Sequence, residues 1–320
     1  MKPLVVYHKD CADGFGAAFA AWRVLRDTAD YLPFDYGNPP DTETWVTQVT
    51  GRDVYLLDVS PKRDLLDLTV EYAEYTVWLD HHDTSFVTRG VPIGRFVEDV
   101  DGLRVVLDKA ASGAILAWEY FHGWRNTPAL LQHVDDRDRW QFKLSGTREI
   151  METLFARRPW SFAQWAELID QWEEINEDLY RGGEILLAAR EQQVKLIVES
   201  CARPCKVKYV RLGADGFSPV GPADFGGPDG GCNTHVGLAT NCPPHLISDV
   251  GHALAAESGT YGLLWYVDSA GKVRVSLRSE GDYDVSGIAK RYGGGGHKNA
   301  AGFTATLEDI AAWTAGPGSA

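Results

Sequence analysis

The stretch VWLDHHDT, Val77–Thr84, places one carboxylate and two imidazoles directly after an apolar run. The segment Tyr75–His82 is rich in β-branched and aromatic residues, which predicts a strand with Asp80, His81 and His82 at its carboxyl end. A single polar cluster at a strand end often only caps the helix that follows. Its meaning therefore depends on whether other strands end in the same way.

Two earlier strands do end in similar residues. The predicted strand Leu4–His8 is followed by Asp10 and Asp13, and the buried run VYLLDV carries Asp58 near its end. Predicted strands and helices alternate over the first hundred residues, which favours a mainly parallel sheet. The carboxyl ends of parallel strands meet at one edge, where open α/β sheets bind their ligands. We therefore expect these carboxylates and imidazoles to lie together.

Such a gathering of groups predicts a metal centre. Several carboxylates in one place repel one another unless a cation lies among them. Carboxylate and imidazole ligands together suit a divalent ion of the manganese type better than a thiolate-seeking ion. More than four ligands indicates two ions that share one carboxylate, as in many phosphoester hydrolases. Each residue alone has a structural explanation, such as a turn or a cap, but three clusters on one sheet do not.

Helix signals fill the intervals between these strands. Ser60 and Pro61 are the expected N-cap and first residue of a helix that runs to about Tyr72. The chain from Lys109 to Ser200 is expected to be mostly helical, and it includes a long helix, Glu173–Ser200, interrupted or bent near Gly182 and Gly183. These patterns predict three parts: a catalytic domain at 1–172, a helical connector at 173–205 and a smaller α/β domain at 206–320.

The smaller domain contains a candidate anion site. Tyr261–Asp268 and Lys272–Ser279 flank the turn residues Ser269, Ala270 and Gly271, which predicts a hairpin. The stretch GGGGHKNAAGF, Gly293–Phe303, is expected to begin as a loop whose successive amides can bind an anion. His297 follows the glycines, and Arg278 is a potential bidentate phosphate donor.

Composition narrows the possible partners. The chain has 320 residues, 44% of them hydrophobic, a net charge of −14 and five cysteines. Its length favours two domains, and its negative charge argues against duplex DNA as a partner. The odd cysteine number favours a reducing compartment, and neither a signal peptide nor a membrane segment is visible, so a cytoplasmic location without membrane contact is expected.

The motifs HKDCADG, LLDVSP, LDHHDT and GGGGHKNAAGF, in this order, resemble those of the DHH superfamily of phosphoesterases with a C-terminal DHHA1 domain. The resemblance extends from the first strand to about Thr304. It implies a two-lobed α/β enzyme with its active site in the cleft. The implied reaction is hydrolysis of phosphoester bonds in short oligonucleotides, dinucleotides or nucleotide phosphates by a two-metal-activated water. The implied cofactor is two Mn²⁺ ions per site, with Mg²⁺ as the alternative.

The resemblance also implies a role for individual residues. His8 and Asp10 would bind the first ion, Asp13 and His81 the second, and Asp58 would bridge them. His82 would face the scissile phosphate and protonate the leaving group, and Asp80 would orient the imidazoles. The substrate would be held by Arg278, Gly294, Gly295, Gly296 and His297. A further ligand is expected from His133–Phe142, where Asp135, Asp136 and Asp138 are available and we choose Asp136.

Some features leave alternatives open. Two residues separate Asp10 from Asp13, where the family often has one, so Asp10 is a weaker match than Asp13. A RecJ-like single-strand exonuclease and a non-catalytic nucleotide sensor are the competing functions, and a basic channel or lost ligands would distinguish them. Cys232, His235, Cys242 and His245 offer an alternative zinc site. Substrate length, monoester or diester chemistry and oligomeric state, a homodimer included, stay open.

Overall fold

A computed structural model describes residues 1–123, 126–207 and 236–315 of the chain. The chain divides into two compact units, Met1–Leu187 and Ala188–Ala320. The division falls inside one long helix, α9, which spans Trp172–Cys201. No helix of the described ranges is long and apolar enough to cross a membrane.

The first unit is built on a six-stranded sheet. Its strands are β1 (Leu4–His8), β2 (Asp30–Phe34), β3 (Asp53–Leu57), β4 (Tyr75–Asp80), β5 (Arg95–Val100) and β6 (Leu103–Asp108). They lie in the order β2-β1-β3-β4-β6-β5. All neighbours are parallel except β5, which pairs antiparallel with β6. The predicted mainly parallel sheet is confirmed, and the β5–β6 hairpin is an addition to it.

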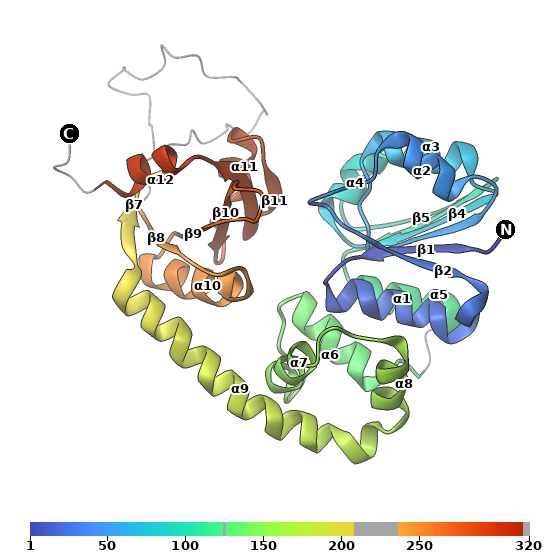
Figure 1. Cartoon of the computed structure of the whole chain (residues 1–320), viewed down its shortest axis with the longest axis horizontal. Helices are drawn as coiled ribbons and strands as arrows, with labels where there is room; N and C mark the ends of the chain where they lie inside the picture. The colour runs from blue at the N-terminus through green and yellow to red at the C-terminus, as the bar shows by residue number, and fades with distance from the viewer. Residues whose placement is uncertain (124–125, 208–235, 316–320) are drawn as a thin grey trace, which may run out of the picture. The chain divides into compact units, whose positions relative to one another are not determined.

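Helices cover both faces of this sheet (Figure 1). On one face lie α2 (Thr42–Val49), α3 (Arg63–Tyr72) and α4 (Asp83–Arg89), and on the other α1 (Ala12–Leu25) and α5 (Gly113–His122). Side chains of β1 alternate accordingly. Leu4 and Val6 belong to the core that contains Trp45 of α2, whereas Val5 belongs to the core that contains Phe19 of α1. This burial of both faces explains the near-continuous apolar runs of the strands.

The start of α3 differs from the prediction. The helix begins at Arg63 with Lys62 as its N-cap, so Ser60 is not the cap that the sequence predicted. The Ser60 hydroxyl instead donates a 2.7 Å hydrogen bond to Oδ2 of Asp80. Ser60 therefore supports the end of β4.

The remaining helices of the first unit are α6 (Ala129–Asp138), α7 (Thr147–Ala156), α8 (Phe162–Asp170) and the first half of α9. Of the interruption or bend expected in α9 near Gly182 and Gly183, the interruption does not occur, because the helix is continuous over its 30 residues. A Cβ atom at Gly183 would lie 1.8 Å from the carbonyl oxygen of Glu149. The glycine therefore lets α9 pack closely on α7.

The second unit has a six-stranded, mainly antiparallel sheet. Its strands are β7 (Arg203–Cys205), β8 (Gly237–Asn241), β9 (Tyr261–Val267), β10 (Val273–Ser279), β11 (Gly295–His297) and β12 (Ala300–Ala305), in the order β11-β12-β10-β9-β8-β7. Among the described strands of this sheet, only β8 and β9 pair in parallel. Three helices pack with this sheet: α10 (Ile247–Ser258), α11 (Ser286–Arg291) and α12 (Leu307–Thr314). A 3₁₀ turn at Pro244–Leu246 precedes α10, and another, Arg26–Thr28, follows α1 in the first unit.

The hairpin predicted around Ser269–Gly271 is confirmed by β9 and β10. The loop expected at the four glycines is in part a strand, because Gly295–His297 pair with β12 as β11. Cys232 and His235 of the alternative zinc site lie outside the described residues. The predicted class, an α/β protein with a mainly parallel first domain and a smaller α/β second domain, is confirmed.

Candidate metal centre

Strand register places the three predicted clusters side by side. Tyr7 pairs with Leu57, and Leu57 pairs with Leu79. The next residues along the three neighbouring strands are His8, Asp58 and Asp80, so all three stand at the same carboxyl edge. The Asp58 amide continues the ladder with a 2.9 Å hydrogen bond to the carbonyl oxygen of Leu79. A parallel sheet thus brings together residues that are far apart in the sequence.

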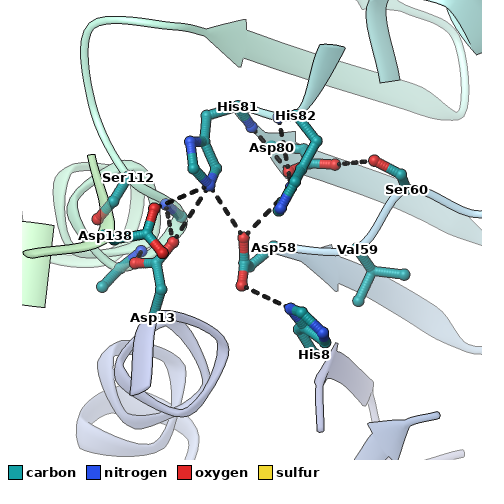
Figure 2. A network of polar contacts seen from close by, with 12 residues as sticks. His8, Asp13, Asp58, Val59, Ser60, Asp80, His81, His82, Ser112 and Asp138 are labelled. Carbon is teal, nitrogen blue, oxygen red and sulfur yellow. Dashed lines mark hydrogen bonds and ion pairs between the residues drawn. The ribbon is translucent and has the colours of Figure 1, made fainter. Parts of the chain in front are cut away.

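Asp58 lies at the centre of the site (Figure 2). Its side chain is only 1% exposed. Its Oδ2 atom lies 3.5 Å from Nδ1 of His8, while Oδ1 lies 3.3 Å from Nε2 of His81 and 3.6 Å from Nδ1 of His82. The Asp58 backbone has a φ of 56°, in the left-handed region that non-glycine residues rarely adopt. Such strain is typical of functional sites.

Asp13 reaches the same place from the first turn of α1. Its two carboxylate oxygens accept 2.7 Å hydrogen bonds from the amides of Gly113 and Ala114, which begin α5. Free amides at a helix N-terminus stabilise a carboxylate. The same carboxylate lies 3.4 Å from Nε2 of His81. Helix α5 therefore fixes the position of Asp13 relative to His81.

Asp80 is fully buried at the end of β4. Its Oδ1 atom accepts 2.7 Å hydrogen bonds from the His81 amide and from Nδ1 of His82. Its Oδ2 atom accepts from the hydroxyls of Ser60 and Ser85. Asp80 therefore orients the His82 ring, and Nε2 is the ring nitrogen of His82 that Asp80 does not engage.

The three candidates for the fourth-motif ligand lie in different surroundings. Asp136, the residue chosen from the sequence, accepts hydrogen bonds from the amides of Lys143 and Leu144 and from the hydroxyl of Thr147. It stabilises the loop after α6 and does not reach the cluster. Asp138 does, because its Oδ2 atom lies 3.4 Å from Nε2 of His81. The carboxylate of Asp135 accepts hydrogen bonds from the Ser112 amide and from the Arg139 guanidinium.

Asp10, the other residue predicted to bind the first ion, lies outside the cluster of candidate ligands. It is exposed, it has a φ of 57°, and it belongs to none of the three groups of described side chains that could hold an ion. Its carbonyl oxygen accepts a 3.0 Å hydrogen bond from Arg158, so the residue serves the turn. Its neighbour Cys11 takes the expected position, with a ligand atom that shares a group with those of His8 and Asp58. The sequence signal was the extra residue that this chain has between Asp10 and Asp13, which made Asp10 the weaker match to the family motif.

The surroundings shift the pKa values strongly. Burial alone would lower the pKa of His81, but the nearby carboxylates of Asp13, Asp58 and Asp138 outweigh it and raise that pKa to about 12. Burial and the charge of Asp13 raise the pKa of Asp138 to about 7. Burial alone would raise the pKa of Asp58, but His8 and His81 hold it well below its usual range. Protons and a divalent cation therefore compete for these atoms.

The cluster fits divalent cations. Nδ1 of His8, both oxygens of Asp58 and Nε2 of His81 are buried and have no hydrogen-bond partner within the described ranges. Their separations of 3.3–3.5 Å exceed the range of about 2.7–3.2 Å that is usual for such hydrogen bonds. Ligand atoms about 2.1 Å from one ion and at right angles to each other lie about 3 Å apart. A cation bound among these unpaired ligand atoms would satisfy them at this spacing.

The candidate ligands form overlapping groups that contain His8, Cys11 and Asp58, then Asp13, His81 and Asp138, and finally Asp58, Asp80, His81 and His82. Within each group the ligand atoms lie within 4.8 Å of one another. Asp58 belongs to two of the groups, with one oxygen toward His8 and the other toward His81 (Figure 2). The arrangement therefore has the features of two adjacent sites joined by one carboxylate.

The predicted substrate residues lie in the second unit. Arg278 of β10 donates hydrogen bonds to the Leu277 carbonyl and the Ser248 hydroxyl, and it has no carboxylate ion-pair partner among residues 188–207 and 236–315. A Cβ atom on Gly294 or Gly296 would lie 2.1 or 2.5 Å from a carbonyl oxygen of β12, so close packing explains these two glycines. At Gly295 a Cβ atom would meet nothing within 4 Å. His297 ends β11 and is partly buried.

Comparison with protein families finds a match in the C-terminal part of the chain. The family model of the DHHA1 domain matches residues 250–314. The DHHA1 domain that the sequence motifs predicted at the C-terminal end is thus confirmed for these residues. Among curated proteins, the uncharacterized protein R106 of Acanthamoeba polyphaga mimivirus is 26% identical over 318 residues. The match covers 94% of this chain, which spans only 66% of the length of that relative.

Among solved structures, the pGpG-specific phosphodiesterase PggH from Vibrio cholerae is similar to this chain with a TM-score of 0.46 and 15% sequence identity. The superposition covers 97% of this chain and 95% of that chain.

The choice between Asp136 and Asp138 leads to a paired prediction. Asp138→Asn should lower the number of bound divalent ions, because it removes a charged ligand beside His81, while the unfolding free energy changes little. Asp136→Asn should retain the ions but lower the unfolding free energy by about 1–3 kcal/mol, because buried donors lose a charged acceptor. Metal analysis and urea unfolding of both variants test this. The opposite pattern would restore Asp136 as the ligand.

Proposed function

We propose that the protein is a metal-dependent phosphoesterase, with Mn²⁺ as its cofactor, that acts on small nucleotide substrates. One observation carries the proposal. Asp58 is a buried carboxylate whose two unpaired oxygens face His8 on one side and His81 on the other. This is the arrangement expected of a carboxylate shared by two ions. The ligand types, carboxylate and imidazole, suit Mn²⁺, and a two-ion centre is typical of phosphoester hydrolysis.

The cations, when bound, would activate water and neutralise phosphate charge. The chain's own residues would supply position and proton transfer. Asp13 and Asp138 would hold one side of the centre and His8 the other, while Asp80 fixes the His82 ring through Nδ1. Nε2 of His82 would then exchange a proton with the leaving oxygen. His82 is partly exposed, as such a group must be to reach substrate.

A pocket of about 160 Å³ in the first unit would accept part of the nucleotide. It is lined by residues that include Phe34, Tyr36, Ser60 and Lys62. Tyr36 links it to the candidate metal centre, because its ring meets His8 edge-on at 5.1 Å and its hydroxyl accepts a 2.6 Å hydrogen bond from the Ser60 amide. An aromatic wall beside a phosphate-binding centre suits a base or ribose.

The second unit would bind the part of the substrate that does not react. Arg278 has guanidinium N–H groups and no carboxylate partner among the described residues of this unit, which leaves it suited to a phosphate. Gly295 has no close-packing reason to lack a side chain, so its open edge supports the approach of a ligand. Gly294, Gly296 and His297 would shape the same short strand.

The test of the proposed function is a hydrolysis panel with Mn²⁺, Mg²⁺ or chelator. The panel contains linear and cyclic dinucleotides, a nucleoside bisphosphate, single-stranded DNA and polyphosphate. We expect turnover of the small nucleotides with Mn²⁺ and none with chelator. Turnover of none of these compounds, in a protein shown to bind metal, would reject the enzymatic proposal in favour of a nucleotide sensor.

Arg278→Ala should weaken substrate binding by about 1.5–3 kcal/mol, the cost of a lost hydrogen bond to a charged group. The effect should appear mainly in KM, and the metal content should not change, because Arg278 belongs to the second unit. Arg274→Ala on the same strand is the control, since Arg274 already pairs with Asp268. Loss of metal in Arg278→Ala would contradict its assignment to substrate.

Substrate length should matter because the protein carries a net charge of −14. A long polyanion meets repulsion outside the site, whereas a dinucleotide carries few charges. We expect kcat/KM to fall by about tenfold or more between about two and about twenty nucleotides at low salt, and the difference to shrink as salt screens the charges. A profile that is flat or rises with length would favour a RecJ-like exonuclease.

A further inference from the structure

Cys11 stands where a ligand of the first site is needed. It is the N-cap of α1 and directly follows the turn at Asp10, but its side chain makes no helix-capping hydrogen bond. Its sulfur belongs to a group in which the ligand atoms of Cys11, His8 and Asp58 lie within 4.8 Å of one another. The exposed Asp10 belongs to no such group.

A second observation points to a ligand at this place. Asp58 is 1% exposed, and its oxygens have no hydrogen-bond partner within the described part of the chain. Nδ1 of His8, 3.5 Å from Oδ2 of Asp58, is buried and lacks one as well. Unpaired buried polar atoms are costly unless a further group satisfies them. A cation between these atoms and the Cys11 sulfur would do so.

We propose that the Cys11 thiolate is the third protein ligand of the first site, with Nδ1 of His8 and Oδ2 of Asp58. The proposal deepens the proposed metal centre and rests on it. In the binding step the S–H bond breaks, its proton goes to solvent, and a sulfur–metal bond forms without oxidation or reduction. Burial and the charges of nearby carboxylates raise the pKa of the free Cys11 thiol well above its usual value, so loss of this proton would accompany metal binding.

The two sites would then differ in their metal preference. The first site offers sulfur, nitrogen and oxygen, whereas the second offers nitrogen from His81 and oxygen from Asp13 and Asp138. A thiolate favours softer ions such as Zn²⁺ or Co²⁺ over Mn²⁺ and Mg²⁺. The protein would therefore bind a softer ion in the first site and a harder ion in the second, with Asp58 between them.

Cobalt provides the direct test, because a thiolate bound to Co²⁺ gives a charge-transfer absorption in the near ultraviolet. Full-length protein freed of metal is titrated with Co²⁺ in three forms: unmodified, Cys11→Ser and Cys201→Ser. Cys201 is exposed and belongs to none of the described candidate groups, so Cys201→Ser is the matched control. We expect the absorption in the unmodified protein and in Cys201→Ser, and its loss in Cys11→Ser.

The outcomes separate this inference from the proposed function. If Co²⁺ binds but the unmodified protein shows no thiolate absorption, or Cys11→Ser keeps it, Cys11 is not a ligand and the metal centre stands. If no Co²⁺ binds at all, the proposed metal centre fails first, and the inference fails with it.

Two further measurements keep the test decisive if Cys11→Ser does not fold. In the unmodified protein, bound Zn²⁺ should slow alkylation of Cys11 but not of Cys201, as followed by peptide mass spectrometry. Cys11→Asp should retain two ions and shift the affinity ratio of Mn²⁺ to Zn²⁺ at the first site by about tenfold or more toward Mn²⁺. Equal alkylation with and without Zn²⁺, or an unchanged ratio, would overturn the proposal.

Discussion

Replacement of Asp58 by Asn is expected to lower hydrolytic activity by more than about 100-fold. Loss of a residue that only supports a metal ligand costs up to about 100-fold, and loss of a ligand shared by two ions should cost more. Asp58 faces His8 through one oxygen and His81 through the other, so a neutral amide would weaken both proposed ion sites together. The number of bound Mn²⁺ ions should fall along with activity. Equilibrium dialysis with metal analysis, beside steady-state kinetics, measures both quantities.

Asp53→Asn is the matched control, since Asp53 begins the same strand β3 but is exposed. It should retain activity and metal. Full activity in Asp58→Asn would exclude the bridging role, whereas loss of activity with unchanged metal content would move Asp58 from metal binding to proton transfer.

The second large effect is expected at Asp80. Asp80→Ala removes the acceptor of hydrogen bonds from His82 Nδ1, the His81 amide and two serine hydroxyls, all in a buried setting. Breaking a buried charged network by removal of one partner costs about 3–5 kcal/mol. We expect the unfolding free energy to fall by about this amount and activity to fall with it, because His82 loses its orientation.

The pH dependence of that loss has a defined sign. Burial alone would raise the pKa of Asp80, but the charge and the hydrogen bond of His82 lower it. A carboxyl group whose pKa is lower in the folded state contributes stability above its unfolded pKa of about 3.9 and loses it as the pH falls further. The difference between the variant and the unmodified protein should thus be full near neutral pH and shrink below about pH 4.

Urea unfolding at several pH values measures this difference. Asp99→Ala is the control, because Asp99 makes an exposed ion pair with Arg104, and such pairs contribute about 0–1 kcal/mol. An equally small effect in Asp80→Ala would mean that the buried network does not hold the end of β4.

Local patterns in the sequence were sufficient for the sheet and for most of the cluster. Apolar runs buried on both faces indicate parallel strands, and parallel strands in neighbouring positions must bring their carboxyl ends to one edge. His8, Asp58 and His81 could therefore be placed together before any coordinates. Their roles as ligands are still predictions that the experiments above test.

Packing between elements decided the rest. Asp136 and Asp138 are two positions apart on α6 and so point to different sides of the helix, and only the packing of α6 shows that Asp138 approaches His81. The turn after β1 exposes Asp10 and brings Cys11 to His8 and Asp58, which the spacing of the motif could not reveal. Gly183 permits close contact with α7, although glycine in isolation suggests a bend. The periodicity of a sequence reports only local structure. Which side chain of one element meets a neighbouring element is decided by how the two elements pack.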